Sequence, residues 1–174
     1  IVAVGEMMVI LTGGIDISLG ASVGLSGTVV ALIIKDFWGI PPLVAVLMGT
    51  AIGALLGAIN GALIVKWKIP PIITTLGTMS LFRGVTFIIN YAVNQGQWVG
   101  ADKFSVPFKD FARGKFLFIP NLLLITIIVY LVFYYFLNHT MTGRKLYAVG
   151  GNRDGATFVG IQVDRILFLP YLFT

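Results

Sequence analysis

The residues best suited to chemistry lie in one short stretch, Thr12 to Gly20, which reads Thr-Gly-Gly-Ile-Asp-Ile-Ser-Leu-Gly inside an apolar run. Its two adjacent glycines let the backbone leave a helix, and at membrane depth such a break is tolerated only where protein or a water-filled cavity covers it. Asp16 is costly in hydrocarbon, so we expect it to face a bundle interior or a polar path. A loop between two helices, with Asp16 on the surface, explains this stretch alone equally well.

A second carboxylate, Glu6, lies in the apolar run before this break. It is either buried or near a helix end, where it reaches water. An intramembrane aspartyl hydrolase would need a second carboxylate facing Asp16; Glu6 could supply it, although the spacing does not require it. An ion-coupled transporter would use Asp16 or Glu6 as its proton or sodium site.

Several other chemistries are set aside by what the sequence lacks. His139 is the only histidine and there is no cysteine, which argues against a histidine metal cluster, a serine triad, thiolate chemistry and a disulfide framework. No P-loop is present, so we do not expect ATP binding by that route. We therefore expect no catalytic residue, no metal and no cofactor.

The elements that must position Asp16 are membrane helices. The 174 residues are 57% hydrophobic and 11% charged, whereas soluble domains carry about 25% charge. The net charge of +5 does not indicate a nucleic-acid partner, because basic residues of membrane proteins gather in loops on one side of the bilayer. The chain begins and ends in apolar sequence, from which we expect a fragment of a longer polytopic protein.

Residues 1–174 are therefore expected to form a single, partial, all-α polytopic transmembrane helical bundle of about five spans or partial spans. A mixed loop is expected over 91–115, and an interfacial tryptophan at Trp38. Pro120 would lie in the first turns of its span. Residues 1–11 are either the end of a cut helix or one half of a broken one. The other expected spans are residues 17–34, 41–65, 72–90, 116–137 and, in part, 166–174.

Glycines recur every four residues in the span 41–65 and so line one helix face. They are Gly49, Gly53, Gly57 and Gly61. This pattern predicts a tight helix contact, with plain packing as the preferred interpretation. Asn60, beside this ladder, either bonds across helices or touches a solute, and packing is again preferred.

The span 72–90 carries a polar stripe that includes Thr75 and Arg83. Arg83 either faces protein and pairs with Glu6 or Asp16, or snorkels to the nearer interface.

The segment 139–165 is long, polar and basic. Asn152 is a good helix N-cap, Asp154 suits a first turn, and Gly160 is a plausible residue just beyond a helix end. The short helix between them would expose Phe158. Such a helix fits either docking onto a partner or resting on lipid headgroups.

This segment and the Lys66–Lys68 turn are separated by two crossings and should share one side of the membrane. The basic residues favour that side as cytoplasmic only marginally.

Three stretches together carry a family resemblance: residues 12–20, residues 69–84, and residues 142–152 with Gly160-Ile161. In collinear order they resemble the permease subunits of bacterial ABC importers, most closely the ribose, rhamnose and autoinducer-2 type of simple-sugar permease. The resemblance runs through the whole sequence, which would cover roughly the middle of such a permease. Gly155 departs from the family pattern, which favours alanine there, and lowers helix propensity by about 1 kcal/mol.

The resemblance implies a multi-pass permease of the bacterial inner membrane that imports a simple sugar or sugar-like solute. Its partners would be a cytoplasmic ABC ATPase, a second permease copy or sister permease, a periplasmic sugar-binding protein and the lipid bilayer. ATP hydrolysis would belong to the ATPase, so the chain itself would not be an enzyme. Ion-coupled transport and intramembrane hydrolysis through Asp16 are the alternatives.

The expected site residues follow from this hypothesis. Residues expected to line or brace the path are Asp16, Ser18, Asn60, Thr75 and Arg83. The segment 139–165 would be a cytoplasmic coupling loop, and its expected ATPase-coupling residues are Gly150, Asn152, Arg153, Asp154, Phe158 and Gly160.

Overall fold

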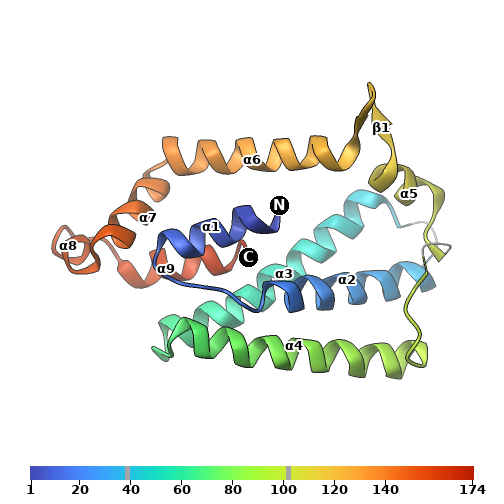
Figure 1. The fold of residues 1–174 in the computed structure, drawn as a ribbon, viewed down its shortest axis with the longest axis horizontal. Helices are drawn as coiled ribbons and strands as arrows, with labels where there is room; N and C mark the ends of the chain where they lie inside the picture. The colour runs from blue at the N-terminus through green and yellow to red at the C-terminus, as the bar shows by residue number, and fades with distance from the viewer. Residues whose placement is uncertain (38–39, 101–102) are drawn as a thin grey trace.

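The computed structural model describes residues 1–37, 40–100 and 103–174, and it is built almost entirely of helices (Figure 1). The expected interfacial Trp38 lies outside the described residues. The helices are α1 (Val2–Leu11), α2 (Leu19–Asp36), α3 (Pro42–Val65), α4 (Pro71–Asn94), α5 (Val106–Arg113), α6 (Asn121–His139), α7 (Met141–Gly151), α8 (Arg153–Phe158) and α9 (Val163–Tyr171). A small antiparallel hairpin joins β1 (Lys115–Phe116) to β2 (Ile119–Pro120).

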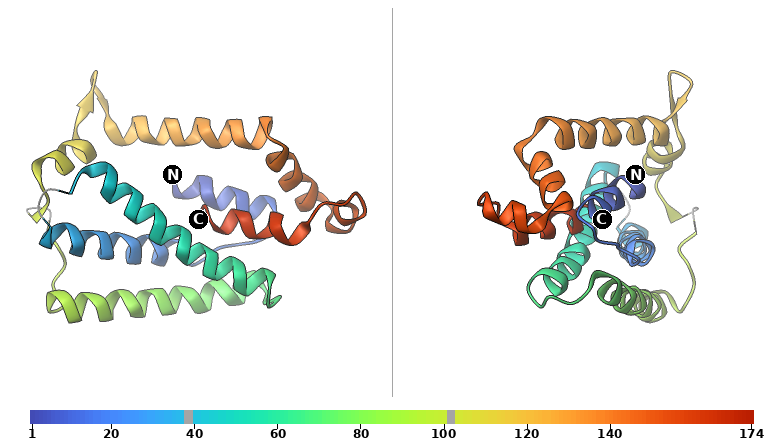
Figure 2. Two further views of the ribbon diagram at one scale, coloured as in Figure 1. Left: turned by 180° about the vertical axis from the view of Figure 1, so that it is seen from behind. Right: turned by 60° about the vertical axis from the view of Figure 1, so that its left-hand side comes forward.

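Within the described residues, α2, α3, α4 and α6 are long and apolar enough to cross a membrane. The two short apolar helices at the ends of the chain, α1 and α9, lie side by side among them (Figures 1 and 2). This arrangement confirms the predicted all-α bundle of complete and partial spans. Proline begins α3 and α4, where its missing N–H costs no helical hydrogen bond.

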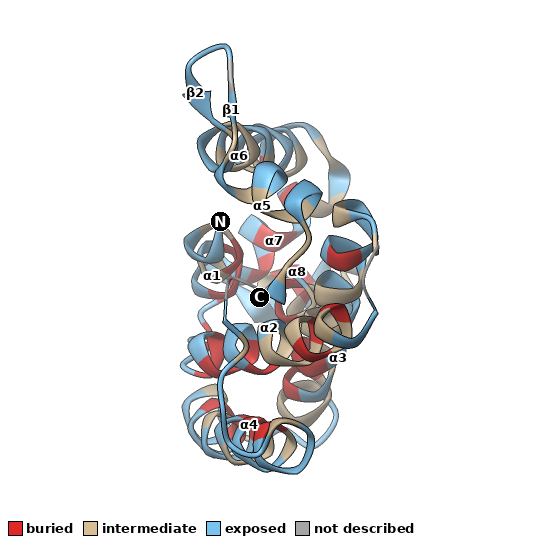
Figure 3. Cartoon of the chain, turned by 90° about the vertical axis from the view of Figure 1, so that its right-hand side faces the viewer, coloured by how far each residue is buried: buried red, intermediate tan, exposed pale blue. Residues whose placement is uncertain are grey.

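The span predicted at 116–137 begins later than expected, and the prediction for Pro120 was wrong. The hairpin occupies residues 115–120, so Pro120 is the N-cap of α6 and does not lie within its first turns. The mixed loop predicted at 91–115 contains helix α5 (Val106–Arg113). Helix α6 lies at the edge of the bundle and carries mainly exposed and intermediate residues (Figure 3).

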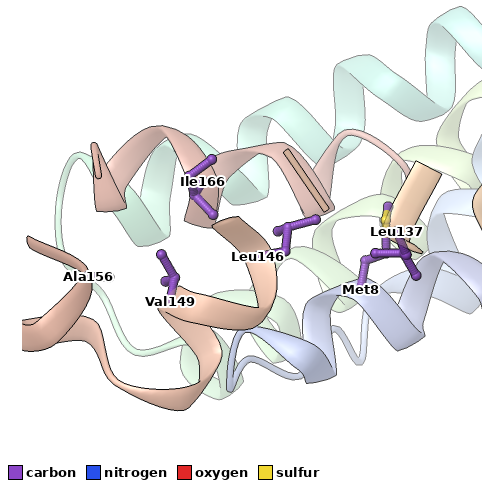
Figure 4. Packing of buried hydrophobic residues seen from close by; sticks show 6 residues of the cluster. All are labelled: Met8, Leu137, Leu146, Val149, Ala156 and Ile166. Carbon is purple, nitrogen blue, oxygen red and sulfur yellow. The ribbon is translucent and has the colours of Figure 1, made fainter. Parts of the chain in front are cut away.

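Among the described residues, a small buried cluster of Val30, Ile34 and Ala45 lies between α2 and α3, and two larger clusters form the rest of the core. In one, α2 packs against α3 and α4 around buried Leu25, Leu56 and Phe82. The other joins the two ends of the chain, where α7, α8 and α9 meet α1 and the end of α6. Figure 4 shows its buried side chains, which are Met8, Leu137, Leu146, Val149, Ala156 and Ile166.

Only part of the glycine ladder on α3 makes the predicted close contact. A methyl group built onto Gly57 would overlap the carbonyl oxygen of Tyr171, and one on Gly61 would lie 2.8 Å from the Phe168 ring. Both contacts join α3 to α9. At Gly53 no atom lies within 4 Å of such a methyl group, and at Gly49 the nearest is a Val30 methyl at 3.7 Å.

The two ends of the bundle carry different connections. The α3–α4 turn and the α7–α8 segment lie at one end. The last turn of α2, the first turn of α3, α5 and the hairpin lie at the other (Figure 1). The Lys66–Lys68 turn and the segment 139–165 therefore share an end, as the sequence predicts. At the opposite end, Lys35 Nζ donates a 2.6 Å hydrogen bond to Asn94 Oδ1 and joins α2 to α4.

Candidate functional site

The predicted break in the first apolar run is present, and α1 and α2 are separated by residues 12–18. Thr12 caps the end of α1, where its hydroxyl donates to the Val9 carbonyl at 2.9 Å. Gly13 follows with φ +79°, a left-handed conformation that favours glycine. Gly14 lies close to α9, because a methyl group there would be 2.6 Å from the Tyr171 hydroxyl oxygen. Glycine is thus favoured by the turn at Gly13, and at Gly14 a larger residue would displace the Tyr171 side chain.

A chain of hydrogen bonds runs from this break to α3. The backbone N–H and the hydroxyl of Ser18 both donate to Asp16 Oδ1, at 2.9 and 2.6 Å. Asn60 Nδ2 donates to the Ser18 hydroxyl oxygen at 2.7 Å. Asp16 is 5% exposed, and Ser18 and Asn60 are fully buried. The structure therefore places Asp16 inside the protein and not on a surface loop.

Two further residues surround Asp16. Its backbone N–H donates to Glu6 Oε1 at 3.1 Å, and its Oδ2 accepts a 3.0 Å hydrogen bond from the Thr174 hydroxyl. Glu6 therefore lies beside the break, but among the described residues no hydrogen bond joins its carboxylate to that of Asp16. This geometry does not form the facing pair that an aspartyl hydrolase would need.

Two acceptor oxygens of this cluster lack donors within the described part of the chain. They are Asn60 Oδ1 and Glu6 Oε2, both buried. Unsatisfied buried acceptors are rare and costly, so they are expected to be satisfied by water or by a bound donor. A hydroxyl-bearing solute would supply such donors.

Thr75 and Arg83, both on α4, have different positions relative to the cluster. Thr75 is fully buried, and its hydroxyl donates to the Ile15 carbonyl at 3.4 Å and to Ile72 of its own helix at 3.5 Å. Arg83 is exposed and, within the described residues, forms no ion pair with Glu6 or Asp16. Of the two alternatives for Arg83, this exposed position favours the one without a carboxylate partner.

A cavity of about 470 Å³ lies beside the break, at the end of the bundle that holds the α3–α4 turn and α8. Residues 12–14 form part of its wall. Charged or hydroxyl side chains from three other segments also line it: Lys68, Arg153, Asp164 and Tyr171. The rest of the lining is mostly aliphatic and proline side chains, so the cavity is a mixed apolar and polar space beside the backbone segment that carries Asp16.

The segment predicted as a coupling loop, 139–165, is mostly helical and forms α7, α8 and the start of α9. Asn152 caps α8 as predicted, with its side chain accepting from the Gly155 N–H at 2.9 Å, and Asp154 lies in the first turn. Gly155 is helical, and a methyl group there would lie 3.2 Å from the Asn152 side-chain carbon. An alanine at this position would therefore make a tight contact with the capping side chain.

The end of α8 is also as predicted. Gly160 has φ +80°, its N–H donates to Thr157, and the Ile161 N–H donates to Ala156, each at 3.0 Å. This pair of bonds is a Schellman motif, which ends a helix sharply. Phe158, just before it, is 90% exposed. The helix therefore presents a large apolar side chain at the surface.

The remaining predicted coupling residues, Gly150 and Arg153, are exposed residues that also make contacts within the protein. Both face the end of α1, and the Arg153 guanidinium donates to the Thr12 carbonyl at 2.9 Å. Sequence reasoning missed Tyr171 and Thr174 as neighbours of the break. The separation between Thr174 and Asp16, 158 residues, explains why no local pattern could have indicated their contact.

Comparison with known proteins gives a consistent result. The family profile described as "Branched-chain amino acid transport system / permease component" matches residues 1–174. The chain is 40% identical over 171 residues to a ribose import permease protein of Bacillus subtilis (strain 168), covering 98% of this chain and 51% of the relative. It is likewise 40% identical over 173 residues to a ribose import permease protein of Escherichia coli (strain K12), covering 98% and 52%.

An autoinducer 2 import system permease protein of Escherichia coli (strain SMS-3-5 / SECEC) is 36% identical over 174 residues, covering 100% of this chain and 52% of the relative. The chain thus spans about half the length of the curated relatives it matches. No solved structure matches it.

Proposed function

The chain belongs to the family of transport-system permease components whose profile spans residues 1–174, and on this premise we propose that it is part of an ATP-driven importer for a sugar or sugar-like solute. The observation that carries the proposal is the 36–40% identity, over almost the whole chain, to proteins named as ribose and autoinducer 2 import permeases. None of these relatives is named as an enzyme or as an ion-coupled transporter.

The bundle of apolar helices supports a position in the bacterial inner membrane. Four helices of the described chain are suitable for crossing it. Helices with so many exposed apolar side chains, including Leu47, Leu55 and Ile88, need lipid or further protein around them.

The buried cluster around Asp16, Ser18 and Asn60 supports a role in lining or bracing the solute path. Polar groups at membrane depth are expensive and are usually retained where they line a path or join helices. Thr75 contacts the same break from α4. Because Arg83 is exposed, we assign it no contact with this part of the path.

The short helix α8 supports docking onto a cytoplasmic ATPase. It has a cap at each end and presents Phe158 to the outside, a combination that suits a rigid element pressed into a groove of a partner. On this proposal the end with α8 and the Lys66–Lys68 turn is cytoplasmic. ATP would be hydrolysed in the partner subunit, a second permease or sister copy would complete the path, and a periplasmic binding protein would deliver the sugar.

The test uses the full-length permease, purified with its ATPase and reconstituted in proteoliposomes with the binding protein. We expect ATP to drive uptake of radiolabelled ribose or of the sugar that the binding protein carries. Phe158→Ala should reduce retention of the ATPase and uptake by about tenfold, because buried aromatic anchors dominate interface energies. Phe118→Ala is the matched control: Phe118 is 95% exposed and lies in the hairpin at the opposite end of the bundle.

Uptake that follows a proton or sodium gradient without ATP would contradict the proposal. Equal effects of the two phenylalanine substitutions would remove α8 as the docking element.

A further inference from the structure

Arg153 connects α8 to the helix break. We propose that it carries the movement of α8 to the break through the Thr12 carbonyl group, an inference that rests on the function proposed above. Arg153 is the first residue of α8, and its Nη2 donates to the Thr12 carbonyl oxygen at 2.9 Å, across 141 residues of sequence. A carbonyl at the end of α1 has no partner within its own helix, so it is free to accept this bond.

A second contact reaches the same point from α7. A methyl group built onto Gly150 would overlap the carbonyl oxygen of Leu11 and lie 3.6 Å from the Thr12 Cα. The backbone of α7 therefore rests directly on the end of α1. The neighbouring Gly151 has no atom within 4 Å of an equivalent methyl group. The close approach is thus specific to one of the two adjacent glycines.

The apolar cluster in Figure 4 makes these helices move together. Met8 of α1, Val149 of α7 and Ala156 of α8 are buried in one cluster, and the first two are fully buried. Close-packed interiors transmit displacement instead of absorbing it. Displacement of α8 is therefore transmitted to residues 11 and 12 through packed side chains.

Both contacts end immediately before the point where the chain can bend. Gly13, with φ +79°, follows Thr12, and the hydrogen-bonded Asp16 lies three residues further on. A few terminal residues that absorb φ/ψ change are the usual form of a hinge. Movement of Thr12 would turn residues 13–18 and alter the bonds from Ser18 to Asp16 and Asn60. Arg153 is thus a positioning residue that acts through Thr12 and does not itself contact solute.

The first experiment compares transport with ATP hydrolysis in the reconstituted full-length complex. Arg153→Ala should retain the ATPase and hydrolyse ATP within about twofold of wild type. Uptake should fall about tenfold or more, the loss expected for one hydrogen bond from a charged donor. Arg153→Lys, which keeps the charge and a donor, should be intermediate. Arg144→Ala is the control, since Arg144 is exposed and bonds Met141 of its own turn; it should behave as wild type.

Gly150→Ala and Gly151→Ala form a second pair on the same helix. We expect the first to lower uptake per ATP hydrolysed and the second to leave it unchanged, because only the first would displace the end of α1.

A measurement at the break itself distinguishes two roles for Arg153: transmitting the movement of α8 to the break, which we call the relay, and only stabilising the fold. Ile15 lies in the break and is 46% exposed, and these 174 residues contain no cysteine. Ile15→Cys, in a full-length chain freed of any other cysteine, should react with a maleimide at different rates with and without ATP plus vanadate. With Arg153→Ala the ATP-dependent difference should disappear. If Arg153→Ala is not recovered from membranes, Arg153→Gln takes its place.

The possible results separate this inference from the proposed function. Normal uptake by Arg153→Ala, or an unchanged ATP-dependent labelling difference at residue 15, would overturn the relay. Loss of the ATPase from Arg153→Ala would also overturn it and make Arg153 a docking residue. If the wild-type chain retains no ATPase at all, the proposed function fails and the relay fails with it.

Discussion

The substitution of Gly57 by alanine tests the packing of α3 against α9 most directly. An added methyl group at Gly57 would overlap the Tyr171 carbonyl oxygen and lie 2.8 Å from its carbonyl carbon, whereas ordinary contact begins near 3.4 Å. The obstructing atoms belong to the backbone of α9, so no side chain can rotate aside. Helices α3 and α9 would have to separate, and Gly14 and Asn60, which lie beside this contact, would shift as well.

The magnitude follows from two opposing effects. Overpacking of this kind costs about 1–3 kcal/mol. Replacing glycine by alanine inside a helix returns about 0.5–1 kcal/mol. We therefore expect Gly57→Ala to lower the free energy of unfolding by about 1–2 kcal/mol. Gly53→Ala makes the same chemical change one turn earlier, where nothing lies within 4 Å, and should stabilise the protein by about 0.5–1 kcal/mol.

The assay measures the midpoint of thermal unfolding of the full-length permease in detergent, with size-exclusion chromatography as the detection method. Uptake in proteoliposomes is measured in parallel. Gly57→Ala should have a lower midpoint than wild type, and Gly53→Ala an equal or higher one. If the two variants are equally stable, or if their order is reversed, α3 and α9 do not meet through Gly57, and the arrangement of the ends of the chain described here is incorrect.

Two further predictions concern the cluster at the break and the cap of α8. Asn60→Leu removes the 2.7 Å donor to Ser18 at similar side-chain volume, and should cost about 0.6–2 kcal/mol of stability and reduce uptake. Asn138→Leu is the control, because the Asn138 amide bonds only its own helix. Its effects on stability and on uptake should each be at most a third as large. Asn152→Ala removes the acceptor for the Gly155 N–H, and should destabilise α8 by about 0.5–2 kcal/mol and weaken ATPase retention. Asn152→Asp keeps the cap and should resemble wild type. Equal ATPase retention by the two variants would argue against a preformed α8.

The features that could be predicted from the sequence are those that depend on near neighbours. Apolar runs of about 20 residues predict membrane helices because each helix satisfies its own backbone, whatever surrounds it. The two ends of α8 were predicted because Asn152 bonds a group three residues away and Gly160 adopts its left-handed conformation within one turn. The start of α6 was misplaced because the short hairpin at 115–120 depends on pairing that hydropathy does not reveal.

The environment of each polar group was decided only by tertiary structure. The sequence was equally consistent with Asp16 on a surface loop or in the interior, and with Arg83 paired or exposed. The structure buries Asp16 through contacts with Thr174 and, by way of Ser18, with Asn60, 42 residues beyond Ser18. It turns the Arg83 face of α4 outward.

The glycine ladder illustrates the same limit. Its four-residue spacing is a property of one helix and was sufficient to place all four glycines on a single face. Whether a glycine on this face is covered depends on the length and position of the neighbouring helix. Helix α9 is short, so it covers Gly57 and Gly61 but does not extend to Gly53. Local sequence therefore determined which surfaces and helix ends exist, and the packing of distant segments decided which of them are buried, since that packing is set by contacts between residues far apart in the chain.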